Sequence, residues 1–185
     1  MKDDDIIIIM DPDMILLRPF TNIYKWDEEV WYHNDNHSTT TTTVVTHGSP
    51  LAQSYDLWYD WNVKFPNMSA IAAMDNDEVS PSPVLSLTTD DVRRYYRYGP
   101  PYVATVRDMA TRMVPTWAEF VPRVYRQYPH LLAEMYAYVL AAAHLQLPHT
   151  MVKSFMLSNT DTVVVVDDDA AAAVLLDNDN ENSSS

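Results

Sequence analysis

The chain has 185 residues, which suits one domain, and a hydrophobic content of 47% with five Trp residues indicates a globular protein with a buried core. The formal net charge of −14 argues against binding to nucleic acid or to an anionic membrane surface, because both need Lys and Arg to neutralise phosphate. The absence of Cys excludes disulfides and thiolate metal sites, and the two Gly residues leave no glycine-rich phosphate loop.

The first predicted element is a strand over residues 6–10, where four consecutive Ile precede Met10. A continuous β-branched run of this kind is typical of a strand buried on both faces, as in a parallel sheet under helices. Pro12 cannot continue a central strand, so the strand is expected to end near Asp11. Asp11 and Asp13 then lie at the carboxyl end of a buried strand, which is the edge where open α/β sheets bind ligands.

The next part of the chain gives weaker signals. Short strands are predicted around residues 31–32 and 44–45, and His-Gly-Ser-Pro at 47–50 predicts a turn. The apolar spacing over residues 51–64 is consistent with a helix, and the Pro-containing stretch 67–87 is expected to be a surface loop.

Helical patterns dominate the second half. Thr-Thr-Asp-Asp at 88–91 is typical of a helix N-terminus, since the hydroxyls can cap it and the acids complement its dipole. A strand is predicted over 102–106, and residues 107–128 are predicted to form two helices whose first turns begin near Pro115 and Pro122.

The clearest predicted helix spans residues 131–145, where apolar residues recur at helical spacing on one face. Strands that alternate with helices indicate the α/β class. Residues 162–185 are near-homopolymeric or acidic and are expected to be a disordered tail, so the folded domain is predicted to span residues 1–161. No apolar stretch approaches the roughly 20 residues that a membrane-spanning helix needs.

The Asp-Pro-Asp sequence at 11–13 is the main candidate for a metal site. Two carboxylates separated by one residue can converge on a hard divalent cation such as Mn²⁺ or Mg²⁺, which prefers oxygen ligands and keeps positions open for phosphates. A metal there would neutralise a departing diphosphate.

Several blocks of the chain resemble the peptidyl serine α-galactosyltransferases of plants and green algae, a family related to the hydroxyproline O-arabinosyltransferases. The first is the Met-Asp-Pro-Asp-Met core with its Arg-Pro end, and another is the Glu-Met-Tyr-Ala-Tyr sequence. The matching blocks are residues 8–20, 99–105, 107–109, 117–125, 128–129, 131–138 and 141–144, with 48–53 matching more loosely.

This resemblance implies a partial GT-A-like fold with a mixed sheet flanked by helices, a UDP-sugar donor, Mn²⁺ (or Mg²⁺), and an endoplasmic reticulum or Golgi location. The acceptor would be Ser or hydroxyproline of a cell-wall-type glycoprotein, and the sugar galactose or arabinose. Asp11 and Asp13 would hold the metal and the diphosphate, and Glu134 would face the sugar or the acceptor as the candidate catalytic residue. His149 is the candidate third metal ligand, because a late His completes the metal site in many GT-A enzymes.

Two alternatives remain open. A GT-A fold builds its nucleotide-base pocket before the metal strand, so that N-terminal part is expected to be missing, and the chain would then be an inactive fragment that at most binds a partner. A strand followed by Asp-x-Asp also begins the haloacid-dehalogenase phosphatases, where Asp11 would be the nucleophile, and Lys153 with the acids at 167–168 resembles their later residues. Against this, Ile15 stands where that family has Thr or Val.

Overall fold

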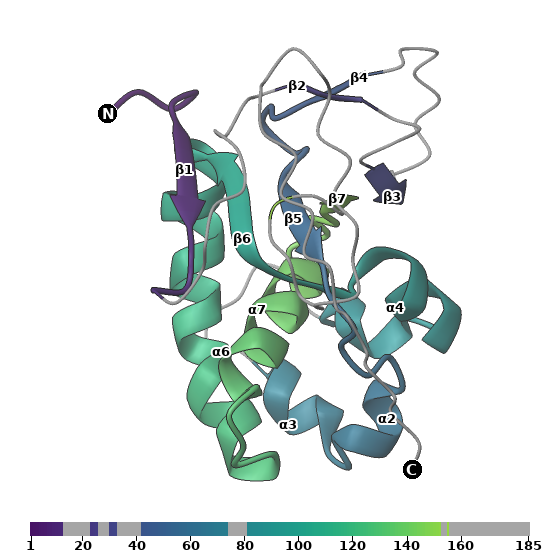
Figure 1. Ribbon diagram of the computed structural model, residues 1–185. Coiled ribbons are helices and arrows are strands. Elements are labelled where there is room, and N and C mark those ends of the chain that lie inside the picture. Colours follow the sequence, from purple (N-terminus) through teal and green to yellow (C-terminus); the bar gives the residue numbers. More distant parts are fainter. Residues whose placement is uncertain (13–22, 26–29, 33–41, 74–80, 153–154, 156–185) are drawn as a thin grey trace, which may run out of the picture.

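The computed structural model describes residues 1–12, 23–25, 30–32, 42–73, 81–152 and 155 (Figure 1). Their main sheet is mixed and has five strands in the order β1-β6-β5-β7-β3. Strands β5 and β7 are parallel, whereas the other neighbouring pairs are antiparallel. A separate antiparallel pair is formed by β2 and β4. The strands span Ile6–Ile9 (β1), Ile23–Lys25 (β2), Val30–Tyr32 (β3), Thr42–Val44 (β4), Leu51–Ser54 (β5), Tyr98–Thr105 (β6) and Thr150–Val152 (β7).

Helices complete the α/β fold that the alternating pattern predicts, and α6 and α7 pack against each other (Figure 1). The helical elements are α2 (Trp61–Lys64), α3 (Met68–Ala72), the 3₁₀ turn η1 (Pro83–Ser86), α4 (Thr89–Tyr95), α5 (Val106–Asp108), the π turn η2 (Met109–Met113), α6 (Val114–Gln127) and α7 (Ala133–His144).

Strand β1 forms where the run of Ile predicts it, but its environment differs from the prediction. It pairs antiparallel with β6 alone among the described strands, so it lies at an edge of the sheet. Ile6 and Ile8 are 40% and 36% exposed, whereas Ile7 and Ile9 pack against the core. The expectation of a strand buried on both faces in a parallel sheet was therefore wrong, because burial follows the side chain's alternation along an edge strand.

The helix predicted over residues 51–64 is also corrected. Residues Leu51–Ser54 form strand β5, which lies between β6 and β7 and has backbone partners on both sides. Only Trp61–Lys64 at the end of the stretch is helical. The apolar spacing reflects a buried central strand followed by core side chains such as Leu57, which is 1% exposed.

Residues 106–127 form one continuous helical region in place of two separate helices, with a π turn between α5 and α6. Pro115 lies in the first turn of α6, as predicted, but Pro122 lies inside that helix. The short strands predicted near residues 31–32 and 44–45 are present as β3 and β4, and the turn at 47–50 is present. The predicted start of α4 is confirmed by a reciprocal capping box of Thr88 and Asp91.

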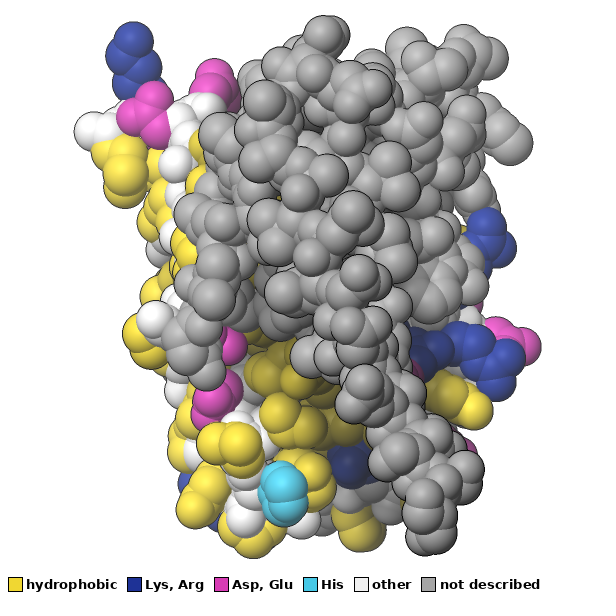
Figure 2. Space-filling view, viewed as in Figure 1, with side chains coloured by type: hydrophobic (Ala, Val, Ile, Leu, Met, Phe, Trp, Pro, Cys, Tyr) yellow, Lys and Arg dark blue, Asp and Glu magenta, His cyan; other side chains and the backbone are white. Residues whose placement is uncertain are grey.

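Helix α7 is the centre of the core. Eleven of its residues are buried, and Glu134 is exposed, so the helix is surrounded by protein and is not simply amphipathic. Such all-round burial is typical of a helix that other elements enclose. On the face shown in Figure 2, hydrophobic side chains gather at the lower left, in the region where α6 lies in Figure 1.

Candidate functional site

Asp11 lies two residues beyond β1 and is exposed. Its position follows from the strand register, because Ile9 at the end of β1 pairs with Tyr102 of β6. Asp13, the second carboxylate of the predicted metal site, lies outside the described residues, as do Lys153 and residues 167–168. The described part of the motif therefore presents one solvent-accessible carboxylate beside the middle of β6.

Glu134 lies in the first turn of α7 and is exposed. The backbone of this turn is fixed from α6, because the indole Nε1–H of Trp117 donates a hydrogen bond of 2.9 Å to the carbonyl oxygen of Glu134. The carboxylate therefore projects from a helix end that is held in place, which is how a rigid scaffold positions a functional side chain.

Tyr102 of β6 is a buried phenol whose pKa both acids influence. Its ring is 2% exposed, stacks on Tyr138 with centroids 3.6 Å apart, and meets Trp117 edge-on at 6.4 Å. Its hydroxyl has no hydrogen-bond partner among the described residues. Burial raises the pKa of this phenol well above its ordinary value, and the nearby Tyr138 and the charges of Asp11 and Glu134 raise it further. Two acids separated by most of the chain thus act on one buried phenol.

His149, the predicted third metal ligand, lies in the core and is 3% exposed. Its Nδ1 is 3.0 Å from the carbonyl oxygen of Leu147, and its Nε2 is 2.9 Å from the hydroxyl of Tyr138. A carbonyl only accepts, so Nδ1 carries the proton and Nε2 accepts from the phenol. Burial lowers the pKa of His149 to about 3, although the bond to Leu147 and the charge of Asp108 oppose the shift. Metal coordination would require breaking one of these bonds, and this ligand role stays a prediction.

The chemistry of the available donors suits a hard cation. Carboxylate oxygens are what Mn²⁺ and Mg²⁺ take as protein ligands. Within the described residues, no group of three or more His, Asp or Glu side chains is arranged to hold a metal ion. A complete metal site would therefore need Asp13 or donors from a bound substrate in addition to Asp11.

Three aromatic residues in and beside α7, Trp117, Tyr136 and Tyr138, have mainly structural positions. Tyr138 and Tyr136 are buried, and Tyr136 packs edge-on against Phe65 at 5.4 Å. Trp117 is partly buried but remains beside Glu134 through its indole hydrogen bond. Of the three, Trp117 is the one that an external ligand could contact.

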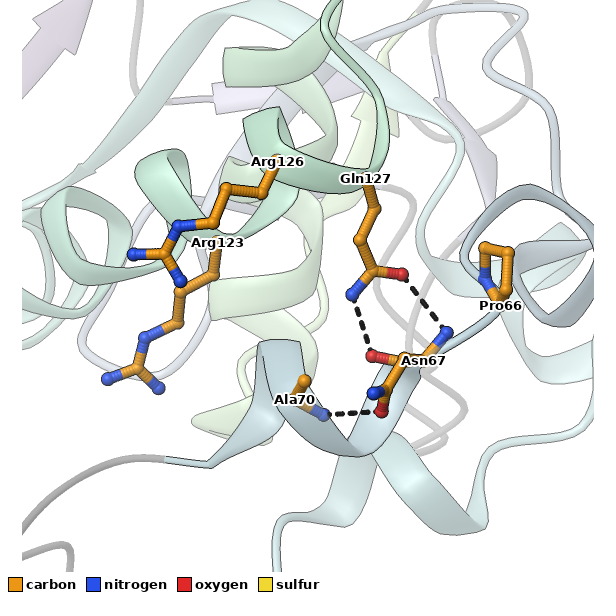
Figure 3. A pocket seen from close by; sticks show the side chains of 6 residues that line it. All are labelled: Pro66, Asn67, Ala70, Arg123, Arg126 and Gln127. Atoms are coloured by element: carbon orange, nitrogen blue, oxygen red, sulfur yellow. Dashed lines mark hydrogen bonds between the residues drawn. The ribbon is translucent and has the colours of Figure 1, made fainter.

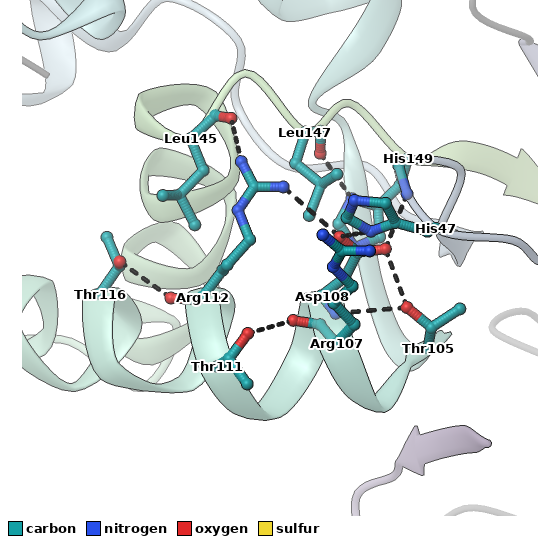
Figure 4. A network of polar contacts seen from close by, with 11 residues as sticks. His47, Thr105, Arg107, Asp108, Thr111, Arg112, Thr116, Leu145, Leu147 and His149 are labelled. Carbon is teal, nitrogen blue, oxygen red and sulfur yellow. Dashed lines mark hydrogen bonds and ion pairs between the residues drawn. The ribbon is translucent and has the colours of Figure 1, made fainter. Parts of the chain in front are cut away.

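Sequence analysis missed a polar cluster around the fully buried Asp108 (Figure 4). One carboxylate oxygen accepts hydrogen bonds from the Gly48 N–H at 2.7 Å and the Thr105 hydroxyl at 3.0 Å. The other lies 2.8 Å from His47 Nδ1 and 3.4 Å from the Arg112 guanidinium. The cluster joins the turn before β5 to the helical region after β6. These contacts indicate that Asp108 stabilises the fold.

Basic side chains gather beside α4 on the right of Figure 2. Arg93 and Arg97 of this region both lie over the ring of Tyr59, at 4.6 and 5.4 Å from its centroid, and Arg97 also pairs with Asp56. These contacts favour a structural role for the two arginines.

None of the helices built from the described residues is long and apolar enough to cross a membrane. Comparison with known proteins returned no match to a family model, to a curated protein or to a solved structure.

Proposed function

We propose that this chain belongs to a metal-dependent glycosyltransferase that moves a sugar, galactose or arabinose, from a UDP-sugar to Ser or hydroxyproline of a glycoprotein. The observation that supports this proposal is the geometry around Tyr102. This residue pairs with Ile9, two residues before Asp11, and its ring meets Trp117, whose indole N–H binds the backbone carbonyl of Glu134. Asp11 follows the first strand and Glu134 lies in the first turn of α7, so the two acids come from distant parts of the sequence.

In this assignment Asp11 and Asp13 bind Mn²⁺ or Mg²⁺ together with the diphosphate of the donor. The metal would neutralise the charge that develops on the departing nucleotide. Glu134, exposed at the start of α7, would face the sugar or the acceptor hydroxyl, where a carboxylate can orient the hydroxyl or accept its proton.

The structure has a mixed sheet with helices, and a GT-A-like domain is the finer assignment that belongs to this proposal. It is supported by the strand before Asp11, which pairs antiparallel with β6, and by the hydrogen bond from Trp117 of α6 to Glu134 of α7. An endoplasmic reticulum or Golgi location belongs to the same proposal and rests on the family resemblance of the blocks at residues 8–20, 99–105 and 131–138.

The first experiment measures metal and nucleotide binding to the 185-residue chain. Mn²⁺ is titrated with and without UDP, and free Mn²⁺ is followed by electron paramagnetic resonance. We expect saturable Mn²⁺ binding that UDP tightens, with a loss of about tenfold or more in Asp11→Asn, since removing one charged ligand costs on the order of 1.5–3 kcal/mol.

The matched control is Asp90→Asn, which removes the same charge from a side chain that is 90% exposed on α4. Equal weakening in both variants would mean that only net charge matters, and absence of any saturable Mn²⁺ binding in the unmodified chain would refute the proposal.

A second experiment separates binding from catalysis. Transfer from UDP-galactose and from UDP-arabinose is measured on Ser-containing and hydroxyproline-containing peptides, with the unmodified chain and Glu134→Gln. Because Glu134 is assigned to the acceptor side, we expect the variant to keep UDP binding and to lose transfer. Retained transfer in Glu134→Gln would exclude that role for the residue.

A further inference from the structure

A hollow of about 360 Å³ lies between the start of α3 and the last two turns of α6 (Figure 3). Volumes of about 300–1,000 Å³ are typical of small-molecule pockets. The residues that line it are Pro66, Asn67, Ala70, Arg123, Arg126 and Gln127. None of them belongs to the candidate site around Asp11 and Glu134.

The side-chain acceptors of this pocket are already used. The Gln127 Oε1 accepts the backbone N–H of Asn67 at 3.0 Å, and the Gln127 Nε2 donates to the Asn67 carbonyl at 2.8 Å. The Asn67 Oδ1 accepts the N–H of Ala70 at 3.0 Å and so caps α3. The bonds fix both amides, and the side-chain groups that remain are the donors of the two arginines and of the Asn67 amide.

The charges of the pocket are positive. Arg123 and Arg126 lie three residues apart on α6, and their guanidinium groups extend in the same direction in Figure 3. Arg123 is partly neutralised by Glu119, whose carboxylate is 3.6 Å away and half exposed, and it also reaches the carbonyl of Ile71 at 3.4 Å. Within the described part of the chain, no acid lies at ion-pair distance from the exposed Arg126.

We propose that this pocket binds the phosphate or sulfate group of a small anionic ester. Guanidinium groups present pairs of N–H donors that match the oxygens of such groups. An anion would relieve the repulsion between two like charges one helical turn apart. Arginines near the end of a helix also complement its dipole, but that role needs neither a hollow nor a surplus of donors. The size of the hollow leaves room for an organic body beside the charged group.

Binding is tested on the full chain at constant ionic strength by calorimetric titration with phenyl phosphate, phenyl sulfate and inorganic phosphate. We expect saturable binding of at least one of these probes. A charge-assisted hydrogen bond contributes on the order of 1.5–3 kcal/mol, so Arg126→Gln should weaken the affinity about tenfold or more. Arg126→Lys keeps the charge but loses the paired donors, so its affinity should lie between those of the unmodified chain and Arg126→Gln.

The control is Arg107→Gln, which removes an equal charge from an exposed arginine of α5 outside the pocket. Tighter binding of the esters than of inorganic phosphate identifies an esterified ligand, and equal binding identifies the free ion. Either result supports the site if the affinity is weakened by Arg126→Gln and not by Arg107→Gln. Equal weakening by both Gln variants, or no saturable binding of any probe, would overturn the inference. These titrations contain no Mn²⁺ or UDP, so their failure leaves the glycosyltransferase assignment untouched.

Discussion

Replacing Asp108 by Asn should destabilise the fold substantially, although the two side chains have nearly the same shape. Asp108 is fully buried, and its two oxygens face four donors. An amide keeps only one oxygen. If that oxygen stays with the Gly48 N–H and the Thr105 hydroxyl, the new NH₂ group faces His47 and Arg112, and two favourable contacts are lost.

The size of the effect follows from the exposure of these partners. Hydrogen bonds to charged groups contribute about 1.5–3 kcal/mol each, but His47 and Arg112 are 40% and 38% exposed and can recover contacts with water. We therefore expect a loss of about 2–3 kcal/mol in the free energy of unfolding. For a domain of this size that corresponds to a fall of roughly 4–12 °C in Tm.

Urea unfolding followed by circular dichroism measures this loss for Asp108→Asn, with Asp90→Asn as the control. Asp90 is 90% exposed, so its substitution should change stability by less than about 0.5 kcal/mol. His47→Ala should cost less than Asp108→Asn, and the double variant should show a coupling energy of about 0.5 kcal/mol or more. An Asp108→Asn protein as stable as the Asp90 control would refute the structural role of the cluster.

Three further outcomes are expected from buried positions. Gly99→Ala should lower the free energy of unfolding by about 1 kcal/mol or less in a urea titration. The Met135 methyl carbon, 2.6 Å from the new Cβ, ends a flexible side chain that can move, and the Tyr55 ring carbon at 3.1 Å needs only a small shift. Tyr102→Phe should leave stability unchanged or slightly raised in the same titration, since it removes a buried hydroxyl without a described partner. The unfolded chain protonates His149 near pH 6.5 and the folded protein near pH 3, so stability should fall as the pH falls between these values. When the pH is lowered from 7 to 5, the free energy of unfolding of His149→Gln should fall by about 2 kcal/mol less than that of the unmodified chain. An identical pH dependence of stability in the two proteins would contradict a buried neutral imidazole.

The sequence predicts elements best where the signal is local. The run of Ile predicts β1, and the hydroxyl and acid of Thr88 and Asp91 predict the start of α4, because strand propensity and helix capping act within a few residues. The same local reasoning misassigns residues 51–54, since a strand buried between two others has no alternation to reveal it.

Contacts between residues far apart in the sequence cannot be predicted from local patterns. Asp108 and the Gly48 N–H that it accepts are 60 residues apart, and no spacing rule links them. Tyr102 is likewise missed as a site residue, because its surroundings depend on how β6 packs on Tyr138 of α7 and Trp117 of α6. The signal that could have drawn attention to it is its place within the block at 99–105 that resembles the glycosyltransferase family.

Tyr102, Trp117, Glu134 and the end of β1 are neighbours in the fold, and the proposed function rests on their arrangement. Residues 8–20 supply Asp11, residues 99–105 supply Tyr102, residues 117–125 supply Trp117 and residues 131–138 supply Glu134. Tyr102 pairs with the end of β1 and packs against Trp117, and the charges of both acids contribute to its raised pKa. The Mn²⁺ titration of Asp11→Asn and the transfer assay of Glu134→Gln decide whether this arrangement serves a metal-bound diphosphate and an acceptor.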